Sequence, residues 1–346
     1  MVPVLQGVTA EELARSTNIE VVDARRLLAR VHRDGKLPHQ AFAGIRRSAL
    51  LKLQQGAAVG ALQVVRVARS SLDPFIKCVL GLPDGQRVES VGWPLEVPER
   101  VVVCVSSQAG CALGCAFCAT GRLGLGRNLD AWEIVEQVRA MREQLSAGQR
   151  VHGVVFQGMG EPLANAEQVF RAIRVLSEPY GPAIDRRRMT VSTAGIPSGI
   201  RRLAREVPEV RLGVSLGSPR RGRREALMPI ERRFPLDTVL EASADHAQIT
   251  HLAPMFALAL ISGVTDTDED AIALAELAKT FASRTGIRPR ISLIPFNAVA
   301  HAGFEPPTPG RIAAFRERVH AAGVGTKLRY SGGGDVAAAC GQLVGT

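Results

Sequence analysis

Short apolar segments alternate with amphipathic segments from about residue 98 to the end of the chain. The apolar segments lie at about 100–106, 152–158, 189–193, 210–216, 255–261 and 290–296, and a shorter one follows at 326–330. Between them, apolar residues recur at helical spacing near 129–145, 166–177, 197–206, 236–247, 268–284 and 309–322. This alternation predicts a parallel sheet with helices outside it. Six such units can form a partial barrel or a doubly wound sheet, and both place function at the carboxyl ends of the strands.

The first part of the chain carries other patterns. Residues 1–55 predict helices, because Thr9 and Glu12 form a capping-box pattern and a second apolar pattern stops at Gly35. Residues 56–97 predict a small β extension of three short strands. We therefore divide the chain into an N-terminal helical segment (1–55), a β extension (56–97) and a core (98–346).

The composition is that of a basic globular protein. The 346 residues are 46% hydrophobic and 22% charged, so the chain can bury a core and is not disordered. No apolar run has the length of a membrane span, and the N-terminus lacks a signal-peptide pattern, so we expect a cytoplasmic protein without a membrane partner. The net charge is +10, and arginines gather at 186–188, 201–202, 220–221, 223–224 and 232–233. Such clusters suit a polyanion such as nucleic acid, although a solvated surface would carry them equally well.

The cysteines concentrate directly after the first predicted core strand. Cys111, Cys115 and Cys118 form a C-x3-C-x2-C pattern, and Cys104 precedes them by seven residues. Three thiolates on one loop can hold a [4Fe–4S] cluster with one iron left open. Structural zinc requires four ligands and could recruit Cys104 as the fourth, and inert buried cysteines are a further alternative.

The stretch CVSSQAGCALGCAFCATGRLGLGRNL at 104–129 resembles the cluster loop of radical S-adenosylmethionine (SAM) enzymes. The longer string is similar to the RlmN/Cfr family of RNA adenine methyltransferases. Further matching strings follow in the family's order from about residue 85 onward: GMGEPLAN (158–165), VSTAGIP (191–197), VSLGSP (214–219), LMPI (227–230), LIPFN (293–297) and GGGDVAAACGQL (332–343). The first 70 residues match only loosely.

The resemblance implies a fold and a set of cofactors. The expected fold is an α/β protein with a partial (β/α)6 radical SAM barrel, and the expected cofactors are one [4Fe–4S] cluster on Cys111, Cys115 and Cys118 and two SAM molecules per turnover. The residues implied to bind SAM are Gly160, Glu161, Ser192, Ser215, Leu216, Gly217 and Asn297. Gly217 departs from the family, which usually has histidine or asparagine there. Without the resemblance, Glu161, Ser192 and Asn297 read equally well as capping or turn residues.

The resemblance also implies catalytic roles for three residues outside the cluster triplet. Cys340 matches the methyl-carrying cysteine, Cys104 the resolving cysteine that forms a transient disulfide with it, and Glu89 the proton acceptor. From the pattern alone, Glu89 would be a strand glutamate facing solvent, and Cys340 would be a packed core residue. Cys78 matches nothing in the family and is interpreted as structural.

The implied function is methylation of an adenine ring carbon in 23S rRNA, tRNA or both. C2 is the favoured position, with a Cfr-like C8 methyltransferase, a radical SAM enzyme on another substrate and a zinc-containing RNA-binding protein as alternatives. The expected partners are RNA, which the helical segment 1–55 could contact, and an electron donor such as flavodoxin or ferredoxin. The protein is expected to be a monomer.

Overall fold

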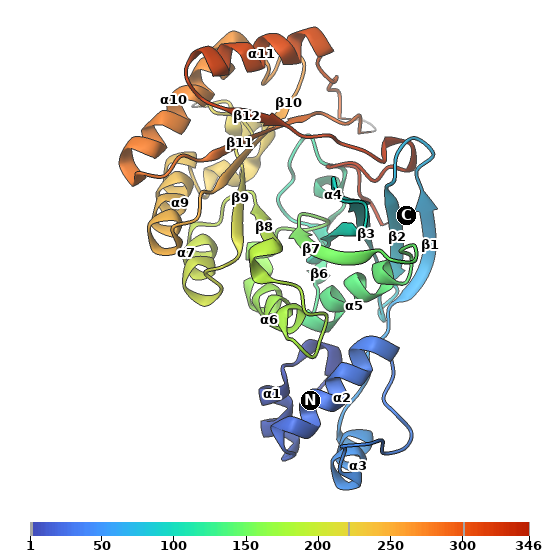
Figure 1. Ribbon diagram of the computed structural model, residues 1–346. Coiled ribbons are helices and arrows are strands. Elements are labelled where there is room, and N and C mark those ends of the chain that lie inside the picture. Colours follow the sequence, from blue (N-terminus) through green and yellow to red (C-terminus); the bar gives the residue numbers. More distant parts are fainter. Residues whose placement is uncertain (1–2, 221, 300–301, 346) are drawn as a thin grey trace.

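The core of the protein is one ten-stranded sheet (Figure 1), seen in a computed structural model that describes residues 3–220, 222–299 and 302–345. Its parallel part contains β4 (Arg100–Val105), β7 (Arg150–Phe156), β8 (Met189–Thr193), β9 (Arg211–Ser215), β10 (Met255–Leu260), β11 (Arg290–Pro295) and β12 (Thr326–Leu328). These strands lie side by side in chain order. A doubly wound sheet reverses its strand order at a switch point, so this order confirms the partial barrel.

Helices cover the outer side of this sheet (Figure 1). They are α5 (Ala131–Arg142), α6 (Ala166–Ser177), α7 (Pro197–Glu206), α9 (Leu236–Thr250), α10 (Asp268–Thr285) and α11 (Pro309–Ala321). Their apolar stripes close a continuous core against the strands, in which Ile134 of α5 and Leu203 of α7 are fully buried. The helical periodicity of the sequence thus predicted each of these helices to within a few residues.

The β extension belongs to the same sheet. β1 (Gln63–Arg69), β2 (Ile76–Gly81) and β3 (Arg87–Pro94) form an antiparallel meander, and β3 pairs with β4 through Val91 and Cys104. The residues before Gln63 do not join β1, because the backbone of Gly60 exchanges two hydrogen bonds with the side chain of Gln6. The ten strands therefore place the extension directly beside the first strand of the barrel.

The N-terminal helices form a projecting unit with its own apolar core (Figure 1). They are η1 (Leu5–Gly7), α1 (Ala10–Thr17), α2 (Val21–Asp34) and α3 (Arg47–Gly56). The predicted capping box at Thr9 and Glu12 is present, and α2 ends at Gly35 as expected. Trp132 of α5 packs against Gly60, in the segment that follows these helices. A Cβ added at Gly60 would lie 2.3 Å from the Trp132 ring, so only glycine fits there.

Several short elements were not predicted. A hairpin of β5 (Gln108–Cys111) and β6 (Gly124–Asn128) frames the cysteine loop, and α4 (Ala119–Arg122) lies within it. The other short elements are α8 (Arg224–Leu227) and the 3-10 helices η2 (Pro162–Asn165), η3 (Arg186–Arg188), η4 (Pro229–Arg232) and η5 (Gly334–Val336). Among the described residues, every helix is too short or too polar to cross a lipid bilayer.

Candidate active site

The cysteine loop lies at the carboxyl end of β4, held by the β5–β6 hairpin. Cys111 ends β5, and Cys118 precedes the first turn of α4. Gly110 has φ +77°, and a Cβ there would lie 2.0 Å from the carbonyl oxygen of Gly124, so glycine is required for the hairpin to close. The hairpin thereby fixes both ends of the loop that carries the three thiols.

The three thiols lie close enough to influence one another electrostatically. Burial, together with the neighbouring thiols of Cys118 and Cys111, raises the pKa of Cys115 to about 12. Burial also raises the pKa of Cys111 to about 11, with Cys118 as a further contributor. Three mutually close thiols on one loop suit a [4Fe–4S] cluster, in which each thiolate binds a different iron.

Zinc fits this arrangement less well. Within the part of the chain that the structure describes, no three histidine, cysteine or acidic side chains converge as a single metal ion requires. Cys104, the fourth ligand that a zinc site would need, lies beside Cys340 instead, and that thiol contributes to its raised pKa. Cys104 is therefore placed with Cys340 and not with the three loop thiols.

Glu161 connects the glycine-rich loop after β7 to the end of β8. Its buried carboxylate accepts hydrogen bonds from the Thr193 hydroxyl (2.7 Å), the Ala194 backbone N–H (2.7 Å) and the Leu163 backbone N–H (2.9 Å). Burial raises the pKa of Glu161, and these three donors oppose the rise. A carboxylate has about four acceptor positions, so one stays available to a ligand amine.

The glycine before Glu161 allows a close approach to the cysteine hairpin. Gly160 has φ +96°, and a Cβ there would lie 2.5 Å from the side chain of Gln108. The same Gln108 accepts a hydrogen bond from the Glu161 backbone N–H at 2.8 Å. The structure therefore brings Gly160 and Glu161 against the loop that carries the thiols.

Ser192 and Ser215 lie near the ends of β8 and β9, as predicted. Both are half-buried, and their hydroxyls have no hydrogen-bond partner among the described residues. Asn297 follows β11, and its side-chain N–H groups donate to the Ser331 hydroxyl (2.7 Å) and to the Cys340 carbonyl (3.0 Å). The two serines are thus free to bind a ligand, whereas Asn297 already contacts the C-terminal segment.

Gly217 is buried at the end of β9, next to Leu216. Its φ is +69°, and a Cβ there would lie 2.5 Å from the sulfur of Met228. Beside it, the fully buried guanidinium of Arg224 donates to the carbonyls of Leu216 and Ala194 and pairs with Glu231. The space of the family's usual side chain is therefore filled by Met228 and Arg224.

The C-terminal segment, defined here as residues 330–344, crosses from β12 to the β extension. On the extension side, Asp73 accepts hydrogen bonds from the Tyr330 hydroxyl (2.9 Å) and the Gly333 N–H (2.8 Å). On the cluster side, the carbonyls of Gly341 and Leu343 accept from Ala119 N–H (2.7 Å) and the Thr120 hydroxyl (2.6 Å). Cys340 is thereby held between the cysteine loop and the extension.

Cys340 and Cys104 line the same cavity of about 760 Å³, which Cys118 also lines. Burial raises the pKa of Cys104 to about 12. Cys340 is exposed toward the cavity, yet removal of its thiol from bulk water raises its pKa as well. The Arg329 guanidinium opposes both rises, so it favours the thiolate forms of the two cysteines. All six cysteines lie in the described part of the chain and are free thiols.

Glu89 does not face solvent, which corrects the interpretation of its strand from the pattern alone. It is fully buried and lies 3.3 Å from the ammonium of Lys77, which is 2% exposed. Lys77 also donates to the Ala337 carbonyl (3.2 Å), and Glu89 accepts from the Val344 N–H (3.3 Å). Lys77 and Glu89 therefore bind the C-terminal segment on both sides of Cys340. Glu89 itself does not line the cavity.

Three residues of the site were missed by the sequence analysis: Lys77, Arg224 and Arg329. Lys77 sits in an apolar strand, IKCVLG, where an ammonium is expected only with a buried partner. This placement is the one signal that could have led to the pair with Glu89. Arg224 and Arg329 lie in basic or polar stretches that resemble any exposed loop.

The site defines a radical SAM enzyme, and residues 105–278, half of the chain, match the Radical SAM superfamily. The chain is 55% identical to a probable RNA methyltransferase of Sorangium cellulosum, over 96% of this chain and 90% of that protein. It is 40% identical to the dual-specificity RNA methyltransferase RlmN of Syntrophobacter fumaroxidans, over 93% and 91%. The crystal structure of a radical SAM methyltransferase from Sphaerobacter thermophilus superimposes with a TM-score of 0.89 and 36% identity, covering 99% of this chain and 100% of that one. The chain belongs to the RlmN family of radical SAM RNA methyltransferases.

Replacing Gly217 with asparagine should destabilise the protein through contact with Met228. We expect Gly217→Asn to lower the free energy of unfolding by about 1–3 kcal/mol, as overpacking does. Gly222→Asn is the matched control, because Gly222 has φ +78° but nothing within 4 Å of its Cβ position. Combining Gly217→Asn with Met228→Ala should cost less than the sum of the two changes. Urea denaturation measures all four variants, and strict additivity would contradict the contact.

Removing one partner of the Lys77–Glu89 pair should destabilise the protein more than removing both. Lys77→Met leaves a buried carboxylate without its cation, and we expect a loss of about 3–5 kcal/mol. The double variant Lys77→Met/Glu89→Gln buries no charge and should recover part of this loss. Equal unfolding free energies of the single and double variants would show that the pair does not act as an ion pair.

Proposed function

We propose that the protein methylates C2 of an adenine ring in 23S rRNA, tRNA or both. The observation that carries this proposal is the pair of thiols outside the cluster triplet, Cys104 and Cys340, which line one cavity together with Cys118. An enzyme that only cleaves SAM needs the triplet alone, whereas a methyl relay needs both further thiols. The relatives named as dual-specificity RNA methyltransferases support two RNA substrates.

When bound, the cluster on Cys111, Cys115 and Cys118 and two SAM molecules per turnover supply a methyl group and a carbon-centred radical. The proposed contacts to SAM come from Gly160, Glu161, Ser192, Ser215, Leu216, Gly217 and Asn297. Four of these offer suitable groups in this structure: the remaining acceptor position of Glu161, the free hydroxyls of Ser192 and Ser215, and the backbone at Gly217. Asn297 would reach SAM from the side of the C-terminal segment that it contacts.

Cys340 is proposed to carry the methyl carbon to the RNA. As a thiolate it accepts the methyl group by displacement, and Arg329 assists by favouring the thiolate. After the carbon-centred radical has removed one of its hydrogen atoms, the carbon would bond to the adenine ring while still attached to the Cys340 sulfur, and the ring would give up its proton to a base and one electron to the cluster. The position of Cys340 beside Cys118 places this carbon next to the cluster loop.

Cys104 is proposed to release the product. Its thiolate attacks the Cys340 sulfur, so that a disulfide forms, the sulfur–carbon bond breaks and its electron pair goes to the carbon on the RNA. A cellular thiol then reduces the disulfide and restores the two free cysteines. The electrostatic effect of Cys340 on Cys104 supports this pairing, because it requires the two sulfurs to be close.

Glu89 is proposed as the acceptor of the ring proton. Its carboxylate contacts the C-terminal segment at Val344, four residues from Cys340. Because Glu89 does not line the cavity, the segment must shift when the base is bound for the proton to reach it. The pairing with Lys77 compensates the buried charge until that happens.

The proposal extends to the location, oligomeric state, electron donor and domains of the enzyme. We propose a cytoplasmic monomer that receives electrons from a flavodoxin or ferredoxin, since one chain supplies every residue of the cavity. We also propose that residues 1–55, 56–97 and 98–346 act as an RNA-contacting accessory segment, a β extension and the catalytic core. The separate apolar cluster of the N-terminal helices supports the first boundary.

The product of the reaction decides between the adenine positions. Expression of the chain in cells that lack their own C2 methylase, followed by RNA digestion and mass spectrometry of the nucleosides, should yield 2-methyladenosine. 8-Methyladenosine would support a C8 enzyme instead. The variant Cys340→Ala provides the background, and unmodified adenosine in cells whose protein carries iron and sulfide would contradict the proposal.

Loss of the resolving thiol should trap the intermediate. We expect Cys104→Ala to accumulate RNA covalently attached to Cys340, visible as a nuclease-sensitive band of increased mass in denaturing gels. Cys78→Ala is the control, because Cys78 is fully buried in β2 away from the cavity. Free RNA with normal product from Cys104→Ala would assign the release step to another group.

A further inference from the structure

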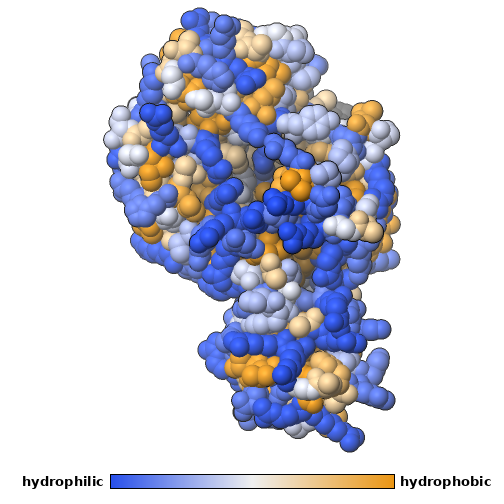
Figure 2. Space-filling view, in the orientation of Figure 1, coloured by the Kyte–Doolittle hydropathy of each residue, from blue (hydrophilic) through white to orange (hydrophobic). Residues whose placement is uncertain are grey.

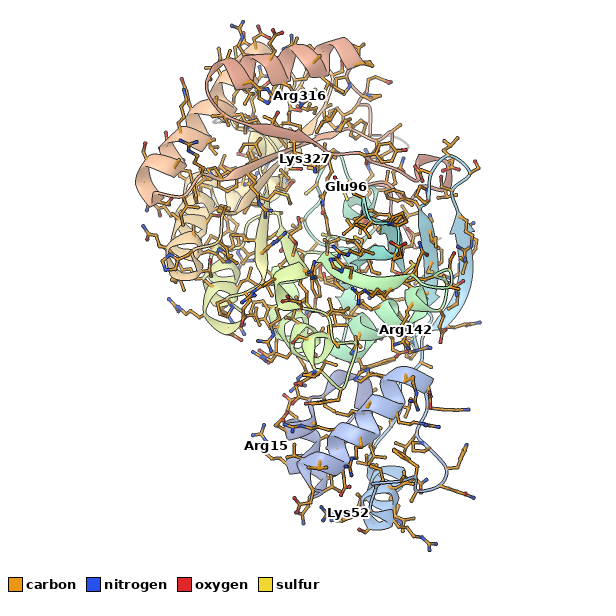
Figure 3. All side chains as sticks on the ribbon, viewed as in Figure 1. Arg15, Lys52, Glu96, Arg142, Arg316 and Lys327 are labelled. Carbon is orange, nitrogen blue, oxygen red and sulfur yellow. The ribbon has the colours of Figure 1, made fainter. Side chains whose placement is uncertain are left out.

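Cations stand at the beginnings of nearly all parallel strands, on the side opposite the cysteine loop. Those nearest the first residue of β4, β7, β8, β9, β11 and β12 are Arg100, Arg150, Arg188, Arg211, Arg290 and Lys327. All six are exposed. Lys327 lies in the upper part of the view in Figure 3, and Figure 2 shows hydrophilic residues interspersed with hydrophobic ones over this part of the molecule. We call this set the cationic mouth.

The cationic mouth shares only Arg188 with the arginine clusters that the sequence emphasised. In those clusters Arg201 pairs with Asp245 and Arg232 with Glu225, and outside them Arg318 pairs with Asp268. By contrast, no member of the cationic mouth pairs with a carboxylate within the described part of the chain. The clustered arginines are thus largely neutralised by the protein itself, and the mouth is not.

This arrangement carries a cost for the folded protein. Arg100 lies directly opposite Arg150 on the neighbouring strand, and like charges in such positions repel. Burial and the charge of Arg211 lower the pKa of Arg290, and burial together with Arg188, Arg100 and Arg150 lowers the pKa of His152. A bound polyanion would relieve this repulsion, which no carboxylate among the described residues does.

The mouth opens into the cavity that contains the cysteines. Arg188, Arg211, Arg290 and Lys327 line the same space of about 760 Å³ as Cys104 and Cys340. Its volume lies in the range of cavities that enclose a ligand of drug size. The cavity thus passes through the barrel from the beginnings of the strands to the cysteines at their ends.

Aromatic rings also line the cavity. Phe75 and Trp93 of the β extension stack with ring centroids 5.5 Å apart, and Tyr330 packs edge-on against Phe75 at 6.3 Å. Tyr330 is 72% exposed, so its ring is accessible to a ligand in the cavity. Exposed rings beside cations are the combination that binds unpaired bases and their phosphates.

We propose that RNA enters through the cationic mouth as a single-stranded loop, with its phosphates on Arg188, Arg211, Arg290 and Lys327 and an unpaired base stacked on Tyr330. This inference rests on the proposed function and adds the route of entry. The target adenine then passes along the cavity toward Cys340. Single-stranded loops are the form in which RNA exposes base faces for stacking, whereas a duplex is too wide for this cavity.

The test compares two variants with the same loss of charge. The mouth variant is Arg188→Gln/Arg211→Gln/Arg290→Gln, and the control is Arg201→Gln/Arg232→Gln/Arg318→Gln. Fluorescence anisotropy measures the affinity of each full-length protein for an RNA hairpin with an adenosine-rich loop, over a series of salt concentrations. We expect the mouth variant to bind at least about tenfold more weakly and to reduce the salt slope by about 2, because each phosphate contact of a single strand contributes about 0.7. The control should bind like the wild type, and thermal unfolding verifies that all proteins fold.

The stacking contact has its own pair of variants. Tyr330→Ala should weaken loop binding by about 5- to 150-fold, which corresponds to loss of one stacked base. Tyr330→Phe keeps the ring and loses only the hydrogen bond to Asp73, so it should bind like the wild type. Equal losses in both variants would assign the effect to the hydroxyl and overturn the stacking contact.

The outcomes separate the route of entry from the function itself. If the wild type methylates RNA but the mouth variant binds no worse than the control, the route is wrong and the function stands. Equal binding of the hairpin and of a blunt duplex would also overturn entry by a single-stranded loop. If the wild type neither binds nor methylates RNA, the proposed function fails, and the inference fails with it.

Discussion

The closure of the barrel by the C-terminal segment is the constraint on which the site depends. The sheet follows chain order from β1 to β12 without pairing those two edges, so its curvature leaves an open side. The segment spans that side through Asp73 and the Lys77–Glu89 pair on the extension, and through Ala119 and Thr120 on the cluster loop. Because Cys340 is part of the closing segment, the contacts that complete the barrel also set the position of the thiol.

Some buried charges lie where segments from different strands meet. Lys77 and Glu89 share one such point, and Arg224 holds the ends of β8 and β9 together through two carbonyls. Buried ion pairs add little net stability compared with apolar packing, but a buried charge without its partner strongly destabilises the folded state. Arrangements of the loops that separate these partners are therefore disfavoured. A site assembled from separate strand ends requires a single arrangement of this kind.

The sequence predicted the regular part of the fold well and its junctions poorly. Strands and helices of the core were found because their apolar residues keep a steady period over several turns or pleats. The β5–β6 hairpin was not predicted, because its strands, QAGC and GLGRN, consist largely of small residues without an alternating apolar pattern. Gly217 could be noted as a departure from the family, but the reason for it, Met228 against its Cβ position, lies eleven residues away and depends on the packing.

The residues of the site also fall into those that the sequence predicted and those that it did not. The cysteine spacing and the strand-end positions of Ser192 and Asn297 were accessible from local patterns. The burial of Glu89 was not, because it depends on Lys77, which lies diagonally across β2 and β3, and on Val344, 255 positions further along the chain. Each cation at a strand beginning could be read from the sequence. Their arrangement along one edge of the sheet depends on the register of the strands, which the sequence does not give.

A cavity that extends through the barrel has a consequence for the kinetics of the enzyme. One end is lined by Cys104, Cys118 and Cys340, beside the loop that carries the cluster cysteines, and the other end opens among the cations. Two ligands that arrive at opposite ends do not need to pass each other. With RNA entering among the cations and SAM bound beside the cysteine loop, as proposed, the small cofactor would be exchanged while the RNA remains in place, so neither ligand would impose an order of binding on the other.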